Sequence, residues 1–291
     1  MKVVVLGAGI MGNGIGQIAA MAGHDVVLCD INADALEKAR ATINKSLQRL
    51  IKSEKLDAAG AAAAEERISV ATDLAVGTSG ADVVVEAVTE VLEVKHQVLE
   101  IAAANAAPTA LLGTNTSQLS ITRIAKPLGD AAERVIGMHF FNPPVVMRLI
   151  ELICGLRTIP ETLERARSFA EGLGKEVVVC KKDSPGFITS RAGAILRLEC
   201  LRMVEEGLAT PEDIDTAIRL AFNHPMGPLE LGDFNGHDTY LHAISSLETQ
   251  FGERFKPTVG LRNMVESGRL GRKTGIGFYR YNADGEKLGP A

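Results

Sequence analysis

The chain has 291 residues, enough for one large domain or two of ordinary size. It is 46% hydrophobic and 23% charged, which is typical of a soluble globular protein, and its formal net charge of −5 argues against non-specific nucleic-acid binding. No apolar run reaches the length of about 18 residues that a membrane span needs. The cysteines are scattered without C-x-x-C spacing, which predicts buried thiols in a reducing cytoplasm and no metal site: Cys29, Cys154, Cys180 and Cys200.

The first thirty residues predict a strand, a glycine-rich turn, a helix and a second strand. Lys2–Leu6 is an apolar, β-branched run typical of a buried strand, and the sequence GAGIMG follows it at once. The helix is expected over Met11–Met21, ending before Gly23. The second strand is expected over Val26–Cys29 and leads into Asp30. In this order, the elements indicate a dinucleotide-binding unit rather than an isolated glycine motif.

Each glycine of the motif has a distinct physical role. Gly7 permits the tight turn out of the strand, Gly9 lets a pyrophosphate approach the backbone, and Gly12 lets the helix pack closely on the strand. The helix N-terminus at Ile10 and Met11 offers unpaired N–H groups to the phosphates. The alternative is that these glycines serve only as turn residues of another kind of α/β protein.

Asp30 is the candidate ribose ligand. It lies eighteen residues after Gly12, where a carboxylate can accept hydrogen bonds from the adenosine ribose. A carboxylate would repel a 2′-phosphate. The sequence therefore predicts NAD, rather than NADP, as the cofactor.

The next 150 residues continue to alternate helices and strands, which predicts an α/β, Rossmann-type doubly wound sheet. A long amphipathic helix is expected over Ile31–Leu56, with Asn32 as its N-cap. Further helices are expected over Asp57–Glu66, Val91–Ala104 and Glu161–Gly172. Further strands are expected over Ile68–Ala71, Asp82–Val88, Ala110–Gly113, Arg134–Phe140, Leu149–Cys154 and Glu176–Cys180.

Strand patterns stop after Cys180. Ser184 followed by proline is typical of an N-cap with proline at the first helical position, and predicts a helix over Gly186–Glu206. Thr210-Pro211-Glu212-Asp213 resembles a capping box at the start of another helix. We therefore expect two domains, a nucleotide-binding domain over residues 1–183 and a smaller all-α domain over residues 184–291.

Polar residues follow several of the predicted strands. Ligands of open α/β sheets bind beyond the carboxyl ends of the strands, so Glu90, Asn115 and Ser117 are candidate cofactor or substrate ligands. Ser117 could donate a hydrogen bond to a substrate oxygen or could simply cap the next helix. No G-x-S-x-G motif surrounds it, which argues against a nucleophilic serine.

His139 and Glu151 form a candidate acid–base pair. His139 ends one predicted strand, and Glu151 lies twelve residues later in the next. A hairpin would bring their side chains together, so that the carboxylate fixes the imidazole tautomer and raises the basicity of the other ring nitrogen. The alternative is a buried histidine with a backbone partner and an unrelated glutamate.

Several motifs, taken in order, resemble those of the 3-hydroxyacyl-CoA dehydrogenase family, and most closely those of its short, single-function 3-hydroxybutyryl-CoA dehydrogenases. The resemblance covers essentially the whole chain, and its HFFNP and HPMGP blocks are more specific than the glycine motif. The motifs are GAGIMGNGIG, EAVTEVLEVK, TNTSQLSIT, GMHFFNPPVVMRLIEL, DSPGFITSR, HPMGPLELGD and GRKTGIGFY.

This resemblance implies an NAD-dependent enzyme that interconverts (S)-3-hydroxyacyl-CoA and 3-oxoacyl-CoA. His139 would be the base that takes the proton of the 3-hydroxyl as hydride leaves C3, Glu151 would orient it, and Ser117 would bind the reacting oxygen. Cofactor contacts are implied at Glu90, Lys95, Asn142 and Lys273.

The resemblance also implies coenzyme A contacts on the helix predicted over Ile31–Leu56. Ser46 matches a serine of the family. Ser53 stands where the family's lysine would align, so the neighbouring Lys52 is the candidate for that contact. The basic face of this helix could equally be an ordinary solvated face, and it consists of Lys38, Arg40, Lys45, Arg49, Lys52 and Lys55. A homodimer joined through the helical domain is implied as well.

The main departure from the family is Ser190, where asparagine is usual. Serine keeps a donor and an acceptor but reaches less far, so we expect retained chemistry with an altered rate or chain-length preference.

Two alternatives to an acyl-CoA dehydrogenase stay open. One is an NAD-dependent dehydrogenase of a free hydroxy acid or sugar acid, and the other, from a different class, is a non-catalytic NAD-binding protein.

Overall fold

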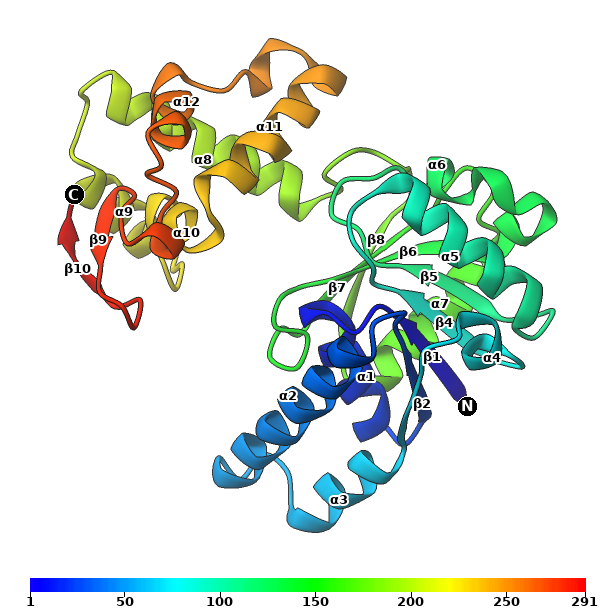
Figure 1. Cartoon of the computed structure of the whole chain (residues 1–291). Helices are drawn as coiled ribbons and strands as arrows, with labels where there is room; N and C mark the ends of the chain where they lie inside the picture. The colour runs from blue at the N-terminus through cyan, green and yellow to red at the C-terminus, as the bar shows by residue number, and fades with distance from the viewer. The chain divides into compact units, whose positions relative to one another are not determined.

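The computed structural model describes all 291 residues, which divide into two compact units, Met1–Phe187 and Ile188–Ala291 (Figure 1). The boundary expected from the sequence, after Asp183, lies in the loop that leads up to this division. Each unit is described by itself below. None of the helices combines the length and the hydrophobicity that a membrane span requires.

The first unit is built on an eight-stranded sheet with the order β3-β2-β1-β4-β5-β6-β7-β8. Its first six positions follow the doubly wound order 3-2-1-4-5-6 and are all parallel, which confirms the predicted Rossmann-type fold. β7 runs antiparallel to β6, and β8 runs parallel to β7. The strands are β1 Lys2–Leu6, β2 Asp25–Cys29, β3 Ile68–Ala71, β4 Val83–Glu86, β5 Leu111–Thr114, β6 Val135–Phe140, β7 Leu149–Ile153 and β8 Glu176–Cys180.

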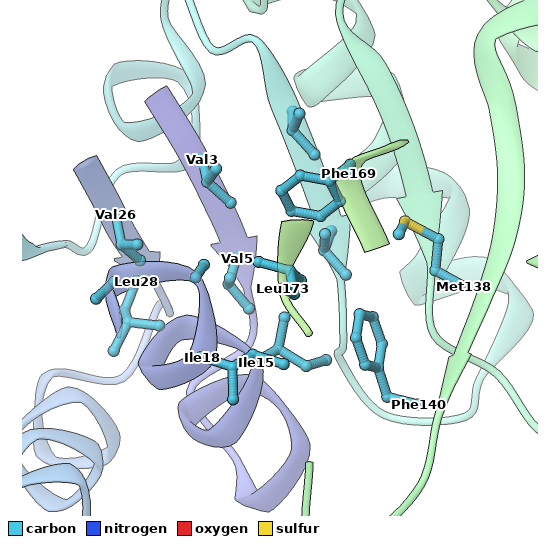
Figure 2. Close-up of a cluster of buried hydrophobic side chains, with 14 of the residues drawn as sticks. Val3, Val5, Ile15, Ile18, Val26, Leu28, Met138, Phe140, Phe169 and Leu173 are labelled. Carbon is cyan, nitrogen blue, oxygen red and sulfur yellow. The ribbon is translucent and has the colours of Figure 1, made fainter. Parts of the chain in front are cut away.

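Helices cover both faces of this sheet (Figure 1). Because successive strand residues point to opposite faces, Val3 and Val5 pack in one cluster while Val4 and Leu6 pack in the other. Figure 2 shows the first cluster, in which β1 and β2 meet α1, with Phe169 beside them. Helices α1 Ile10–Met21, α2 Ala33–Lys52, α3 Ala58–Glu66 and α7 Pro160–Gly172 contribute to the first cluster. Helices α4 Leu74–Thr78, α5 Leu92–Asn105 and α6 Ile121–Ala125 contribute to the second, and a 3₁₀ segment η1, Lys126–Arg134, leads into β6.

Local side-chain and backbone features explain where two helices begin. The predicted N-cap of α2 is confirmed, since the Asn32 side chain accepts hydrogen bonds from the N–H groups of Asp34 and Ala35. The prediction that Ser184 caps the next helix is wrong. The backbone enters the left-handed region at Gly186 (φ 75°) and Phe187 (φ 49°), so α8 begins only at Thr189.

The second unit is mainly helical, as expected, and also carries a short antiparallel β-ribbon that the sequence pattern did not predict. The first turn of α9 is capped as predicted, since the Thr210 hydroxyl oxygen accepts a hydrogen bond from the N–H of Asp213. Its elements are α8 Thr189–Glu205, α9 Pro211–Ala221, α10 Pro228–Asn235, α11 His237–Phe251, η2 Glu253–Phe255, α12 Val259–Glu266, η3 Arg272–Thr274, β9 Tyr279–Tyr281 and β10 Lys287–Pro290.

A buried carboxylate, Asp233 at 1% exposure, joins α10 to this ribbon. It accepts hydrogen bonds from the N–H groups of Phe278 (3.0 Å) and Tyr279 (2.9 Å) and from the hydroxyl of Tyr281 (3.1 Å). His237, one turn along the chain, donates to the same carboxylate through Nε2 (2.6 Å). The C-terminal ribbon is thus held by a charged acceptor inside the unit rather than by apolar packing alone.

His237 is fully buried, and its second ring nitrogen, Nδ1, accepts a hydrogen bond from Arg197 Nη2 at 2.9 Å. This pairing fixes the neutral imidazole with its proton on Nε2. Burial lowers the pKa of His237 below its ordinary value of 6.5, the Arg197 charge lowers it further, and Asp233 and Asp238 oppose both effects.

We therefore expect the second unit to lose stability in acid. Below pH 6.5 the unfolded chain binds a proton at His237 that the folded chain does not, so the free energy of unfolding is retained above pH 6.5 and falls as the pH decreases. Urea unfolding of the wild type and of His237→Gln, on both sides of this pH, measures the effect. The variant should lose less stability on acidification, and parallel losses in the two proteins would contradict the expectation.

Candidate active site

The glycine loop between β1 and α1 has the shape that a pyrophosphate requires. Gly7 has a φ of 99°, and a Cβ there would lie 2.6 Å from the carbonyl oxygen of Ala87. A Cβ on Gly12 would lie 1.8 Å from the carbonyl oxygen of Gly7. At Gly9 no atom lies within 4 Å of a Cβ position, and no side chain caps the N-terminus of α1, which begins with Ile10 and Met11. The loop therefore presents open space and helix N–H groups to an anionic ligand.

Asp30 follows β2 and is tied to this loop. Its Oδ2 accepts a hydrogen bond from the N–H of Ala8 at 2.9 Å, and its Oδ1 accepts one from the N–H of Asn32, also at 2.9 Å. Each carboxylate oxygen can accept a further hydrogen bond. Asp30 therefore shapes the glycine loop and still has acceptor capacity for ribose hydroxyls.

The expected hairpin is present, and its register places His139 of β6 directly opposite Glu151 of β7. His139 Nδ1 lies 2.7 Å from Glu151 Oε2, with the carboxylate fully buried and the imidazole 5% exposed. The rings of Phe141 and Phe187 flank the imidazole. A carboxylate at Nδ1 holds the proton on that nitrogen and leaves the lone pair on Nε2 for proton transfer.

Ser117 faces this free nitrogen, with its Oγ 3.1 Å from His139 Nε2. Its own N–H donates to Glu90 Oε1 at 3.1 Å, and the Thr116 hydroxyl donates to the same oxygen. Asn115 accepts a hydrogen bond from the N–H of Phe140 through Oδ1, at 3.0 Å. The loop after β5 is therefore fixed to the end of β6. The hydroxyl of the exposed Ser117 lies beside the imidazole of His139.

An ion pair that the sequence analysis missed lies beneath this group. Glu86 at the end of β4 and Lys95 of α5 are both fully buried, and Lys95 Nζ lies 2.8 Å and 3.0 Å from the two Glu86 oxygens. Lys95 also donates to the carbonyl of Asn115 (3.0 Å) and lies 3.4 Å from Glu90 Oε2. Lys95, which the resemblance assigns to cofactor contact, is thus placed under the site, where it links Glu86 to the two loops that hold Ser117.

Burial raises the pKa of Glu86, while Lys95, the Thr114 hydroxyl and the N–H of Val88 oppose that rise. All of these partners are donors, which suits an ionised carboxylate. The signal was available in the sequence as an acidic residue at the end of the apolar run VVV, with a lysine nine positions later.

The other candidate residues lie in three places. Asn142 is exposed in the loop after β6. Ser46 is half-buried and Lys52 exposed on α2. All six basic side chains of the predicted face are exposed, although Lys55 lies beyond the end of α2. Ser190, in the first turn of α8, and Lys273 belong to the second unit. There Lys273 pairs with Asp238 at 2.6 Å, and this hydrogen bond lowers the pKa of the Asp238 carboxyl.

Replacing Glu86 by glutamine should destabilise the first unit strongly. The change removes the nearer counter-charge of the buried Lys95 ammonium and leaves only the 3.4 Å contact with Glu90, and breaking comparable buried pairs costs about 3–5 kcal/mol. Urea unfolding of Glu86→Gln measures the loss, and Glu93→Gln, an exposed residue on α5, is the matched control. Equal stability of the two variants would show that the ion pair contributes nothing.

Comparison with known proteins agrees with this geometry. Residues 2–184 match the 3-hydroxyacyl-CoA dehydrogenase NAD binding domain, and residues 186–281 match the C-terminal domain of the same family. A 3-hydroxybutyryl-CoA dehydrogenase of Bradyrhizobium diazoefficiens is 42% identical over 281 residues, covering 96% of this chain and 95% of that protein. The human mitochondrial hydroxyacyl-coenzyme A dehydrogenase is 39% identical over 286 residues, covering 96% and 90%.

Among solved structures, the (S)-3-hydroxybutyryl-CoA dehydrogenase PaaH1 from Ralstonia eutropha is similar over the whole molecule. It superposes with a TM-score of 0.92 at 42% identity, covering 97% of this chain and 99% of that chain. The chain therefore belongs to the 3-hydroxyacyl-CoA dehydrogenase family, and its first unit carries that family's NAD binding domain.

Proposed function

We propose that this protein, as an NAD-dependent dehydrogenase of that family, interconverts (S)-3-hydroxyacyl-CoA and 3-oxoacyl-CoA, with 3-hydroxybutyryl-CoA as the model substrate. The observation that carries the proposal is the connected group Ser117–His139–Glu151 at the carboxyl edge of the sheet that holds the glycine loop. The names of the relatives support the substrate class, since both the Bradyrhizobium protein and PaaH1 are 3-hydroxybutyryl-CoA dehydrogenases.

The residues of this group have separate tasks in the proposed reaction. His139 takes the proton of the 3-hydroxyl on Nε2 in the oxidation and returns it in the reduction. Glu151, bonded to Nδ1, keeps the ring in place and stabilises the imidazolium that forms. The Ser117 hydroxyl donates to the reacting oxygen. NAD, when bound, supplies the hydride acceptor at the substrate C3.

The residues that would hold the dinucleotide are those of the first βαβ unit. The N–H groups at Gly9, Ile10, Met11 and Gly12 suit the pyrophosphate, and Asp30 suits the ribose hydroxyls and disfavours a 2′-phosphate. The other proposed contacts follow strands that end at the same edge, and they are Glu90, Asn115, Ser117 and Asn142. The buried Lys95 donates to the Asn115 carbonyl and pairs with Glu90. Lys273, in the second unit, stays a candidate cofactor contact because of the family resemblance alone.

The coenzyme A tail is proposed to bind along α2, at Ser46 and Lys52, where the exposed basic face suits its phosphates. A homodimer through the second unit is also proposed. Supporting it, that unit exposes several large apolar side chains: Leu208, Leu220, Phe222, Leu231, Phe234 and Val259. A cytoplasmic location is supported by the four free cysteines, two of which, Cys29 and Cys200, have thiol pKa values raised by burial to about 11.

The test of function is NADH consumption with acetoacetyl-CoA, run beside free acetoacetate and beside NADPH. Fast turnover with the CoA ester and NADH alone is expected. Turnover only with free oxo acids would favour the hydroxy-acid alternative. Tight NADH binding without turnover on any of these substrates would favour a non-catalytic NAD-binding protein.

Removing the imidazole should slow the reaction without removing the cofactor site. His139→Gln is expected to lower kcat by about 10²–10⁴-fold, as for the loss of a general base, with NADH affinity preserved. Steady-state kinetics and NADH fluorescence titration measure the two quantities. His96→Gln, a change at a half-buried histidine on α5 whose Nε2 lies 2.8 Å from the Arg123 carbonyl, is the control. Wild-type kcat in His139→Gln would exclude His139 as the base.

Restoring the family asparagine should alter catalysis on acyl-CoA substrates. Ser190→Asn lengthens a side chain in the first turn of α8, and we expect a changed kcat or KM that depends on acyl length, because an amide reaches further than a hydroxyl. Kinetics with 3-oxoacyl-CoA substrates of increasing length measure this. If both constants stay unchanged at every length, Ser190 has no part in substrate binding.

A further inference from the structure

Lys175 is a buried lysine without a counter-ion. It lies between α7 and β8, is 8% exposed, and no carboxylate lies within ion-pairing distance of its ammonium. Burial lowers its pKa. Because burying an unpaired charge is costly, such a lysine needs a compensating role.

The ammonium is held by backbone carbonyls of one loop, residues 141–148, which joins β6 to β7. Lys175 Nζ donates to the carbonyl oxygens of Pro144 and Met147, the latter at 2.7 Å. This loop closes the hairpin that carries His139 and Glu151. It begins two residues after His139 and ends three residues before Glu151. Two prolines in the loop donate no N–H, and the Pro144 and Met147 carbonyls take their hydrogen bonds from Lys175, a donor outside the loop.

The same loop is held from its other side by α1. A Cβ on Gly14 would lie 2.8 Å and 2.9 Å from the Pro144 Cδ and Cγ atoms, so the helix surface and the proline ring are already in contact. Val145 of this loop and Met11 of α1 also pack against one apolar cluster, the first cluster of the sheet. Pro144 is therefore fixed at its carbonyl by Lys175 and at its ring by the helix whose N-terminus follows the glycine loop.

We propose that Lys175 and Gly14 are positioning residues, which clamp the 141–148 loop to α1 and so set the placement of His139 relative to the glycine loop. This inference rests on the proposed function, because the placement matters for the transfer of hydride and proton in one geometry. Neither residue touches the reacting atoms in this role. The larger effect is on kcat, since the glycine loop and Asp30 are unchanged, and only the proposed contact of Asn142, which lies in the clamped loop, links the clamp to cofactor affinity.

Three variants test the clamp. Lys175→Met keeps the unbranched chain and removes the donors, Lys175→Arg keeps donors, and Gly14→Ala inserts a methyl group against Pro144. We expect Lys175→Met and Gly14→Ala to lower kcat for acetoacetyl-CoA by about ten- to a hundredfold, with a smaller change in NADH affinity through Asn142, and Lys175→Arg to recover part of the loss. Lys181→Met, at an exposed lysine just after β8, is the matched control.

Two results separate this inference from the proposed function. If the wild type does not reduce acetoacetyl-CoA, the proposed function fails, and the clamp is then decided by amide hydrogen exchange. The N–H groups of Val146 and Met147, both bonded to the Pro143 carbonyl, should exchange faster in Lys175→Met than in the wild type. Wild-type kcat in Lys175→Met, with only its melting temperature changed, would overturn the inference, as would unchanged exchange in an inactive wild type.

Discussion

Antiparallel pairing of β7 with β6 places Glu151 directly opposite His139, and the chemistry proposed here depends on that register. In a strand, a shift of one residue turns every side chain to the other face, so a slipped β7 would remove the carboxylate from Nδ1 altogether. The register is reinforced from both sides. β8 pairs with β7 over its whole length. Ile150 and Leu152, the apolar residues on either side of Glu151, are fully buried.

Three buried cations are accommodated in three different ways. Lys95 is neutralised by Glu86, whose carboxylate also accepts from Thr114 and Val88. Lys175 is held by carbonyls alone. Arg197 lies over the ring of Tyr240 and donates to His237 while its Nε has no hydrogen-bond partner. Each cation joins segments far apart in the sequence, so the polar interior specifies how helices and loops meet where apolar packing alone would allow some slippage.

The sequence predicted most of the first unit because its parallel strands are buried on both faces and read as continuous apolar runs. The ranges expected for β1, β3 and β8 coincide with those observed. The Asn32 cap and the His139–Glu151 hairpin were predicted for equally local reasons. These features depend on residue patterns within one or two neighbouring elements.

The features that escaped prediction depend on distant partners or on unusual backbone. Lys175 has the residue type of a solvated surface, and only the fold shows what covers it. Glu86 ends an apolar run in the sequence, but only the fold shows its pairing with Lys95. The onset of α8 is delayed by Phe187, a non-glycine residue with positive φ that no propensity argument anticipates. The ribbon of β9 and β10 is short, and it is held by Asp233, more than forty residues earlier in the chain.

The two hydrogen bonds of Asp30 bear on any attempt to redesign the cofactor preference. Replacing an acidic residue at this position by a neutral or basic one is the direct way to admit a 2′-phosphate. Here the same carboxylate also accepts the N–H of Ala8, inside the glycine loop, and that of Asn32, which caps α2. The proposed cofactor selection and the observed loop architecture therefore depend on one side chain. A variant that accepts NADP needs a second substitution that supplies a new acceptor for the Ala8 amide.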